Sequence, residues 1–120
     1  MNHRIMKHQI TNHRISEILS RLLSSEVFDI KKDTSALIYD LPYLRERINS
    51  IRESFPAKTF HSLAIKACPI PKLLEYLGDM NVGLEAASMG ELKIAEKSGY
   101  PPCKIVYDSP VKTFDELEFA

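Results

Sequence analysis

The sequence predicts an α/β fold in which short buried strands alternate with amphipathic helices. Apolar runs at residues 59–66, 82–87 and 104–107 have the length and composition of buried strands. Each run is followed by a short loop and then by apolar residues at the three-and-four spacing of a helix. Strands joined through helices lie parallel, and a parallel sheet needs cover on both faces. Three such strands leave two open edges, so we expect further strands from a longer chain or from a partner.

Composition and charge exclude several classes of partner. The 120 residues include 16 basic and 16 acidic side chains, so the net charge is zero and supplies no basic field for nucleic acid or anionic lipid. No apolar run approaches the roughly 20 residues that cross a bilayer, and the first eight residues lack the apolar core of a signal peptide. We therefore expect a cytoplasmic chain without nucleic-acid or membrane partners. The wide separation of Cys68 and Cys103 favours reduced thiols over a disulfide framework or a zinc site.

Residues 1–35 are expected to form a polar segment that contains one amphipathic helix. The apolar stripe of this helix ends before Ser24 and comprises Ile15, Ile18, Leu19, Leu22 and Leu23. His3, His8 and His13 are five residues apart, a spacing that rotates each histidine away from the last on a helix. A polar, partly frayed segment is therefore favoured over a metal site.

Residues 36–57 are expected to form a strand and a helix that lead into the alternating units. The run 36–39 is apolar and suits a buried strand. Asp40 is a typical N-cap, and Pro42 suits the first helical turn. The apolar stripe of the helix comprises Leu41, Leu44, Ile48, Ile51 and Phe55. Pro56 then ends the helix.

Residues 58–120 are expected to hold three strand–helix units. After the first strand, apolar residues at positions 70, 73, 74 and 77 predict a helix that is closed by Gly78. Residues 88–91, Ser-Met-Gly-Glu, match a capping box and predict a helix that runs to about residue 99. Residues 113–116, Thr-Phe-Asp-Glu, match a second capping box, ahead of an apolar stripe that begins at Phe114.

Lys66 is the first candidate for a chemical role. Strand alternation places it on one face with the small residues Ser62 and Ala64. The carboxyl end of a parallel strand is where barrel and doubly wound enzymes place catalytic groups. Burial there would favour the neutral amine, which is the form that makes a Schiff base with an aldehyde. The spacing alone leaves open a lysine that reaches solvent from the end of a strand.

An ordered series of motifs runs from residue 36 to residue 120. It includes Leu37-Ile38-Tyr39-Asp40-Leu41, Ala64-Ile65-Lys66-Ala67, Gly83-Leu84-Glu85-Ala86-Ala87-Ser88-Met89-Gly90-Glu91-Leu92 and Ser109-Pro110-Val111-Lys112-Thr113. Through this series the chain resembles the opening of the fold-type-III pyridoxal-phosphate decarboxylases, which act on diaminopimelate, ornithine or arginine. The resemblance implies the first three units of a (β/α)8 barrel of the alanine-racemase type. Residues 36–39 would then be a strand of a separate β domain.

The resemblance also implies roles for three residues of the candidate site. Lys66 matches the lysine that holds pyridoxal phosphate through a Schiff base, and Ala64 matches the small residue that lies against the cofactor. Glu85 stands where the family usually has aspartate and would pair with the amine of Lys66 once substrate has freed it. A strand-end carboxylate that caps a neighbouring helix is the alternative interpretation of Glu85.

The function implied is decarboxylation of a basic or diamino acid, with diaminopimelate converted to lysine. We expect this activity in a larger homodimeric enzyme, because the glycine-rich phosphate loop and the glutamate for the pyridine nitrogen are absent here and the 120 residues alone would be inactive. Two alternatives remain at this stage. One is a catalytically silent relative that binds and regulates a decarboxylase. The other is an amino-acid racemase or another pyridoxal-phosphate-binding protein of the same barrel class.

Three further side chains near Lys66 are given structural interpretations. Cys68 is expected to be a buried structural thiol, although it could line the pocket. His61 is expected to face away from Lys66 and to pack against helices. Glu91 is expected to cap a helix, and a secondary role near the site is left open for it. We expect no metal ligands in this set.

Overall fold

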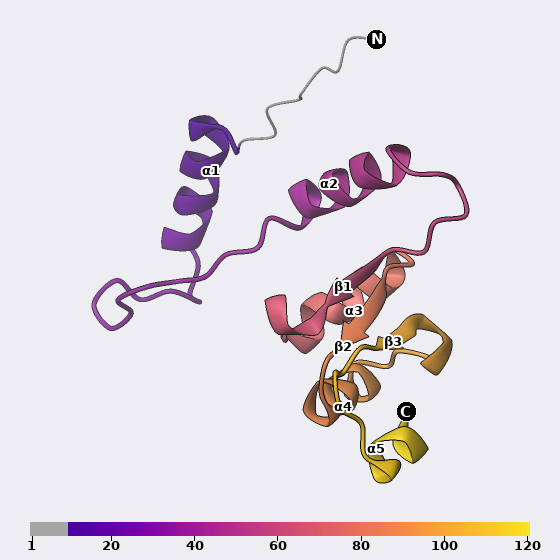
Figure 1. The fold of residues 1–120 in the computed structure, drawn as a ribbon. Coiled ribbons are helices and arrows are strands. Elements are labelled where there is room, and N and C mark those ends of the chain that lie inside the picture. The colour runs from indigo at the N-terminus through magenta and orange to yellow at the C-terminus, as the bar shows by residue number, and fades with distance from the viewer. Residues whose placement is uncertain (1–9) are drawn as a thin grey trace. The chain divides into compact units, whose positions relative to one another are not determined.

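The computed structural model describes residues 10–120 and divides the chain into two compact units, Met1–Tyr39 and Asp40–Ala120 (Figure 1). In its described part, the first unit contains helix α1, and the second contains helices α2–α5 and a three-stranded sheet. The candidate residues Ala64, Lys66 and Glu85 all belong to the second unit.

Helix α1, Asn12–Leu23, confirms the helix expected in the first unit. Its N-cap is Thr11, whose side chain accepts the N–H of Arg14 at 3.2 Å, and Ser24 is its C-cap. No residue of α1 is buried, so the predicted apolar stripe packs into no core here. His13 lies on α1, whereas His3 and His8 lie outside the described residues.

The predicted strand at residues 36–39 is not formed in the structure. The sheet of the described chain consists of strands β1, β2 and β3 alone, and none of them pairs with this run. Leu37 is 79% exposed. A strand needs a neighbour to complete its ladder of backbone hydrogen bonds, and the described residues offer none to this run. The apolar composition that predicted the strand is therefore insufficient to form one.

Helix α2, Leu41–Glu53, begins at the predicted N-cap but ends before Phe55, the last residue of the predicted stripe, with Ser54 as its C-cap. Asp40 caps it through the N–H of Tyr43, and Pro42 occupies its first turn. Polar contacts connect α2 to α3, Pro71–Asp79: the hydroxyl of Tyr76 donates to the carbonyl of Leu41 at 3.2 Å and accepts from Arg45 Nε at 3.0 Å. No residue of α2 is fully buried, so these polar contacts supplement limited apolar packing.

The sheet is parallel, with strand order β1–β2–β3, as expected (Figure 1). Its strands are β1, Ser62–Ala64, β2, Gly83–Ala86, and β3, Ile105–Tyr107. Helix α3 connects the first two strands, and α4, Met89–Lys97, together with the short 3-10 turn η2, Pro102–Lys104, connects the second and third. Helix α5, Phe114–Phe119, follows β3.

The first strand is shorter than predicted, and Lys66 lies beyond it. Pairing with β2 ends at Ala64, and residues Ile65–Ala67 form a 3-10 turn, η1, in which the N–H of Cys68 donates to the carbonyl of Ile65 at 2.9 Å. The strand face that the sequence assigns to Lys66 is therefore corrected to a turn at the end of that strand. Ile65 takes the fully buried position in this turn.

The core lies between one face of the sheet and the helices α3 and α4. Its largest fully buried side chains are Ile65, Leu74, Leu77 and Leu84. Because strand side chains alternate, Ala64, Glu85 and Val106 lie together on the opposite face. These three residues are half-buried or exposed, so in the described part of the chain this face lacks the cover that the core face has.

Gly78 does not close α3 as predicted but lies inside it. The left-handed residue after the helix is Asn81, with φ 58°, a conformation that asparagine tolerates better than most residues. Gly78 is small for a different reason: a Cβ there would stand 3.3 Å from the ring of Tyr100. The close packing of the Tyr100 ring, rather than the end of the helix, explains why a glycine stands at this position.

Helix α5 begins with the predicted capping box. The side chain of Thr113 accepts the N–H of Glu116, and the carboxylate of Glu116 accepts the N–H of Thr113 at 2.8 Å. The backbone hydrogen bond from Thr113 is the main reason that the pKa of Glu116 is lowered. The apolar stripe predicted for this helix finds no core, since Phe114 is 91% exposed.

Tyr100, which follows α4, packs against α3 in the core. It is 7% exposed, and its hydroxyl donates to the carbonyl of Leu74 at 2.8 Å. Burial, with a smaller contribution from the carboxylate of Asp79, raises the pKa of Tyr100 to about 12.

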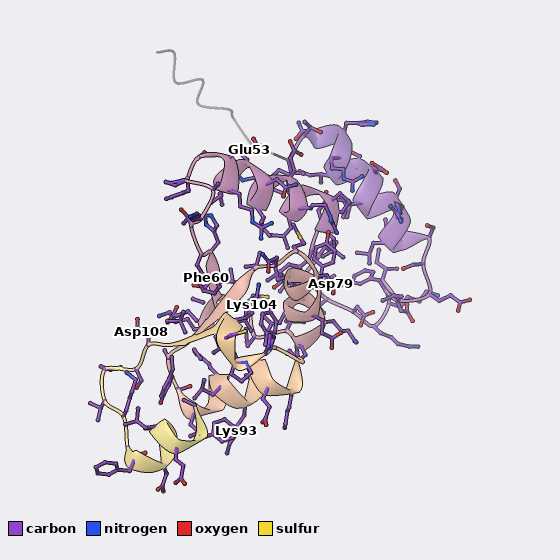
Figure 2. All side chains as sticks on the ribbon, turned by 90° about the vertical axis from the view of Figure 1, so that its right-hand side faces the viewer. Glu53, Phe60, Asp79, Lys93, Lys104 and Asp108 are labelled. Atoms are coloured by element: carbon purple, nitrogen blue, oxygen red, sulfur yellow. The ribbon has the colours of Figure 1, made fainter. Side chains whose placement is uncertain are left out.

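Gly83→Ala should destabilise the second unit. A Cβ at Gly83 would stand 2.2 Å from the ring of Phe60, labelled in Figure 2, and 2.8 Å from the backbone carbonyl of Lys104, which cannot move aside without disturbing the sheet. Overpacking of this kind costs about 1–3 kcal/mol. Gly90→Ala is the control, because its Cβ would meet only Ser88 Oγ at 3.8 Å and should stabilise α4 by about 0.5–1 kcal/mol. Urea denaturation of both variants measures the difference, and equal stability would contradict this packing.

Raising the pH from 8 to 11 should lower the free energy of unfolding through Tyr100. The folded-state pKa of about 12 exceeds the ordinary value of 10, so the unfolded state loses the proton first as the pH rises. The stabilisation is complete below pH 10 and is lost as the pH rises through 12, and about 1.4 kcal/mol of it should be gone at pH 11. Tyr100→Phe should lack this part of the pH dependence. The same loss in the variant would show that other groups cause it.

Candidate functional site

Lys66 and Glu85 meet beyond the carboxyl end of β1. The amine Nζ of Lys66 lies 3.9 Å from the carboxylate Oε1 of Glu85. The Lys66 side chain is 64% exposed and that of Glu85 is 21% exposed. The family resemblance implied that Glu85 pairs with the amine of Lys66, and the structure brings the two side chains within ion-pair distance.

The register between β1 and β2 brings the Lys66 amine close to the Glu85 carboxylate. Ala64 is the last paired residue of β1, and its partner across the ladder is Glu85. Lys66 follows Ala64 by two residues, in η1, so its side chain starts one step beyond the strand end next to Glu85. The methyl group of Ala64 is half-buried and occupies little of the face between them. Two neighbouring strands therefore supply an amine, a carboxylate and a small residue to one spot.

The environment of Lys66 differs from the buried site expected for a neutral amine. The exposed fraction of its side chain shows that the described residues do not desolvate it. An exposed ion pair contributes only about 0–1 kcal/mol. In the described residues, Lys66 therefore reaches solvent, which is the alternative that the spacing had left open. The pair with Glu85 orients the amine but does not bury it.

Glu85 caps no helix in the described residues. The N-cap of α4 is Ser88, and α3 begins without a side-chain cap. The Glu85 carboxylate instead forms an ion pair with Lys66. The helix-cap interpretation of Glu85 is therefore not what the geometry displays.

The turn between β2 and α4 departs from the predicted capping box. Ser88 Oγ accepts the N–H of Glu91 at 3.3 Å, as expected. The carboxylate of Glu91 accepts the N–H of Ala87 at 2.7 Å, rather than that of Ser88. Of the two hydrogen bonds that make a capping box, only the one to Ser88 Oγ is present. The Glu91 carboxylate binds the N–H of Ala87, the residue that directly follows β2. Sequence reasoning misses this contact, because the pattern Ser-x-x-Glu is the same in both arrangements.

Cys68 and His61 have the structural surroundings of packing residues. Cys68 is half-buried and packs against the core, and neither it nor Cys103 forms a disulfide. His61 lies with its ring edge-on to Phe55, 5.4 Å between centroids and 80° between planes. Phe55 follows the end of α2, so the predicted packing of His61 against helices is corrected to packing against a loop residue.

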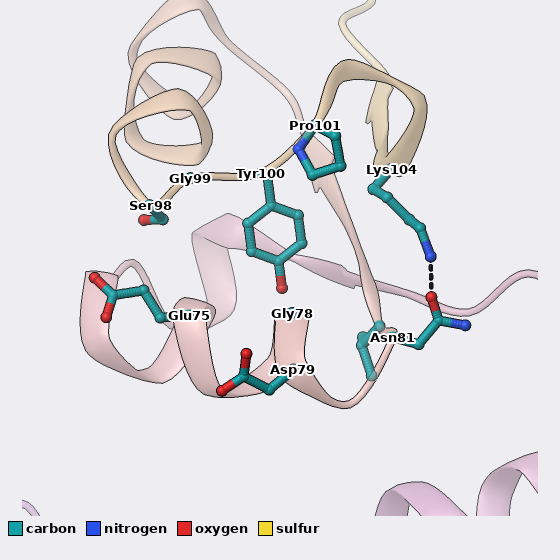
Figure 3. Close-up of a pocket in the computed structure, with 10 residues that line it drawn as sticks. Glu75, Gly78, Asp79, Asn81, Ser98, Gly99, Tyr100, Pro101 and Lys104 are labelled. Atoms are coloured by element: carbon teal, nitrogen blue, oxygen red, sulfur yellow. Dashed lines mark hydrogen bonds between the residues drawn. The ribbon is translucent and has the colours of Figure 1, made fainter.

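A cavity of about 470 Å³ opens at the other end of the sheet. It is lined by Glu75, Gly78, Asp79, Asn81, Val82, Ser98, Gly99, Tyr100, Pro101 and Lys104. Figure 3 shows the ring of Tyr100 over Gly78, and the amine of Lys104 bonded to the side chain of Asn81. These residues precede β2 and β3, whereas parallel sheets place active sites at the carboxyl ends of strands. The cavity therefore does not mark the site at Lys66.

Residues 10–120 hold no group of three or more histidine, cysteine, aspartate or glutamate side chains placed to bind a metal ion. None of the described helices has the length and apolar character needed to cross a membrane.

The side chains at the end of β1 are chemically suited to an aldehyde cofactor. An amine that condenses with an aldehyde is supplied by Lys66, and a carboxylate that can receive the amine stands 3.9 Å away on Glu85. Ala64, one methyl group in size, leaves the adjoining sheet face open. Lys66, Glu85 and Ala64 therefore fit the aldehyde end of such a cofactor. Glycines occur separately at 78, 83, 90 and 99, so the described chain offers no glycine-rich loop for a phosphate.

Comparison with known proteins matches the second unit almost completely. Residues 41–120 match the family model described as "Pyridoxal-dependent decarboxylase, pyridoxal binding domain". A diaminopimelate decarboxylase of Aquifex aeolicus is 37% identical over 84 residues, which are 70% of this chain and 20% of that protein. The diaminopimelate decarboxylase of Campylobacter jejuni is 33% identical over 89 residues, 73% of this chain and 22% of that protein.

A relative whose name gives different substrates aligns with more of the chain. The lysine/ornithine decarboxylase of Selenomonas ruminantium is 29% identical over 110 residues, 91% of this chain and 26% of that protein. No solved structure gave a significant match. The chain spans about a fifth to a quarter of the length of these relatives. Because the family model covers residues 41–120, the chain belongs to the pyridoxal-dependent decarboxylase family and carries part of its pyridoxal-binding domain, whose cofactor is pyridoxal phosphate.

Proposed function

We propose that this chain is the lysine-bearing N-terminal part of an amino-acid decarboxylase that converts diaminopimelate to lysine. The observation that carries the proposal is the approach of Lys66 Nζ to Glu85 Oε1 at the ends of two parallel strands. The family match supports decarboxylation as the reaction class. The names of the relatives from Aquifex aeolicus and Campylobacter jejuni support diaminopimelate as the substrate.

Lys66, Glu85 and Ala64 have separate roles in this proposal. When bound, pyridoxal phosphate supplies an aldehyde carbon for an amine and a ring that takes up the electron pair left by the departing carboxylate. Lys66 would hold this cofactor through Nζ, which would fix the reacting end of the site next to β1. Glu85 would pair with the amine of Lys66 whenever that amine is not bonded to the cofactor, and would hold it aside. Ala64 leaves the space against the sheet in which a flat ring fits.

The remaining parts of the proposed enzyme lie in sequence that this chain does not contain. The three units of residues 58–120 would begin a (β/α)8 barrel, with residues 36–57 leading into it and residues 1–35 before them. Such a barrel takes about 250 residues, and the relatives are four to five times longer than the stretch matched here. The exposed side of the sheet would then face the barrel interior, where it would acquire the cover that it lacks. We further propose a cytoplasmic homodimer as the working form.

A catalytically silent relative that regulates a decarboxylase is the second candidate. The observation that favours it is the pair of open sheet edges, β1 and β3, which could pair with strands of a partner. The largely exposed Lys66 is also compatible with a chain that holds no cofactor. The relatives reported above are decarboxylases, so a racemase receives no support from them.

Lys66→Ala in the full-length protein should abolish decarboxylation. Without its amine the protein has no group at the end of β1 to bond the aldehyde, and the release of carbon dioxide should fall by orders of magnitude. Lys93→Ala is the matched control: Lys93 is an exposed residue of α4, labelled in Figure 2, and its loss should change the rate by no more than about twofold. Full-length protein that releases no carbon dioxide even with Lys66 intact would favour the silent relative.

Diaminopimelate should be turned over faster than lysine or ornithine. Each amino acid is offered separately to the loaded full-length protein, and kcat/KM is obtained from the carbon dioxide released. The ratio of these values is the specificity. A higher value for ornithine or lysine would contradict the substrate, while leaving the reaction class intact. It would agree better with the name of the Selenomonas ruminantium relative.

A further inference from the structure

The carboxylate of Glu91 makes a contact that lies outside a standard capping box. In that motif the glutamate accepts the N–H of the cap residue itself, which is Ser88 in this chain. Glu91 Oε2 instead accepts the N–H of Ala87 at 2.7 Å. Ala87 directly follows β2, so this hydrogen bond ties the first turn of α4 to the end of the strand.

The end of β2 is held at two successive residues. The carbonyl of Ala86 accepts the N–H of Asp108 at 2.8 Å, which fixes the strand end to the chain after β3. The N–H of Ala87 is fixed to Glu91 from the helix side. Glu85 comes directly before Ala86 in β2, so its backbone lies within two residues of both hydrogen bonds. The direction of the Glu85 side chain therefore depends on backbone that Glu91 holds.

We infer that Glu91 is a positioning residue that keeps Glu85 within ion-pair reach of Lys66. The inference rests on the proposed function of Lys66 and Glu85, and Glu91 acts on them only through the backbone. Their separation of 3.9 Å is close to the limit of about 4 Å for an ion pair, so a small rotation at the end of β2 separates them. Glu85 is half-buried in the sheet and cannot follow Lys66 freely.

The test measures the reactivity of the Lys66 amine in cofactor-free full-length protein. Brief treatment with acetic anhydride at one pH, followed by mass spectrometry of peptides, gives the labelling rate of Lys66 relative to the exposed Lys93. Glu85→Gln removes the carboxylate that pairs with the amine. The labelling rate of Lys66 relative to Lys93 should then rise by about twofold to fivefold, the change expected from the loss of an exposed ion pair. Glu91→Ala should raise it to a similar extent, because the end of β2 is released.

Two matched variants separate positioning from simple capping. Glu91→Gln keeps an oxygen that accepts the N–H of Ala87, so the Lys66 rate should stay at the wild-type value. Ser88→Ala removes the other hydrogen bond of the helix start, from the N–H of Glu91 to Ser88 Oγ, and should also leave Lys66 unchanged. Circular dichroism of each variant verifies that the chain is folded when it is labelled.

Three results would overturn the inference. A Glu91→Ala rate equal to wild type, with Glu85→Gln raised, would make Glu91 a helix cap alone. An equal rise in Ser88→Ala and Glu91→Ala would assign the effect to the start of α4 in general. If Glu85→Gln itself leaves Lys66 unchanged, the ion pair is absent and the inference fails with it. Failure of the proposed function is distinguished separately, because capture of pyridoxal phosphate by Lys66 is measured in loaded protein.

Discussion

The register between β1 and β2 is the constraint on which the candidate site depends. Because Ala64 pairs with Glu85, the turn that follows β1 carries Lys66 past the carboxylate of its neighbouring strand. A shift of one residue in this pairing would send Glu85 to the opposite face, among the side chains of the core. Apolar packing holds this register, because Leu84 and Ile65 are fully buried on the core side. Packing on one face of the sheet thus determines the chemistry available on the other.

The two faces of the sheet have unequal support in this chain. Helices α3 and α4 and the ring of Tyr100 cover one face, and the hydroxyl of Tyr100 satisfies the carbonyl of Leu74 inside that layer. The face that carries Ala64 and Glu85 has no comparable layer among the described residues. This asymmetry explains why Lys66 is positioned but not desolvated: position comes from the strands, whereas desolvation needs atoms that would lie across the open face.

Local signals in the sequence predicted the helices well. Asp40 and Thr113 form the N-caps expected of them, because a cap is a contact between residues three apart and needs little from the rest of the fold. Strand ends were predicted less well: β1 stops at Ala64 because its pairing with β2 stops there, which the composition of residues 59–66 does not encode. The run 36–39 has the composition of a strand but no pairing partner among the described residues.

The candidate site was predictable in its residues but only partly in its geometry. Lys66, Glu85 and Ala64 came from resemblance to a family, and their proximity agrees with strand order. The contact from Glu91 to Ala87 and the packing of Tyr100 on Gly78 could not be predicted, since each depends on how turns and distant residues settle in three dimensions. The sequence left the exposure of Lys66 open, because alternation describes the face of a residue and not what lies above it.

The central claim is that Lys66 bears the cofactor, and chemical fixation tests it most directly. Full-length protein loaded with pyridoxal phosphate is reduced with borohydride and digested, and the modified peptide is sequenced by mass spectrometry. We expect a single pyridoxyl group on Lys66, with the exposed Lys93 and Lys72 unmodified. A pyridoxyl group on another lysine, or none in protein that has bound the cofactor, would contradict it.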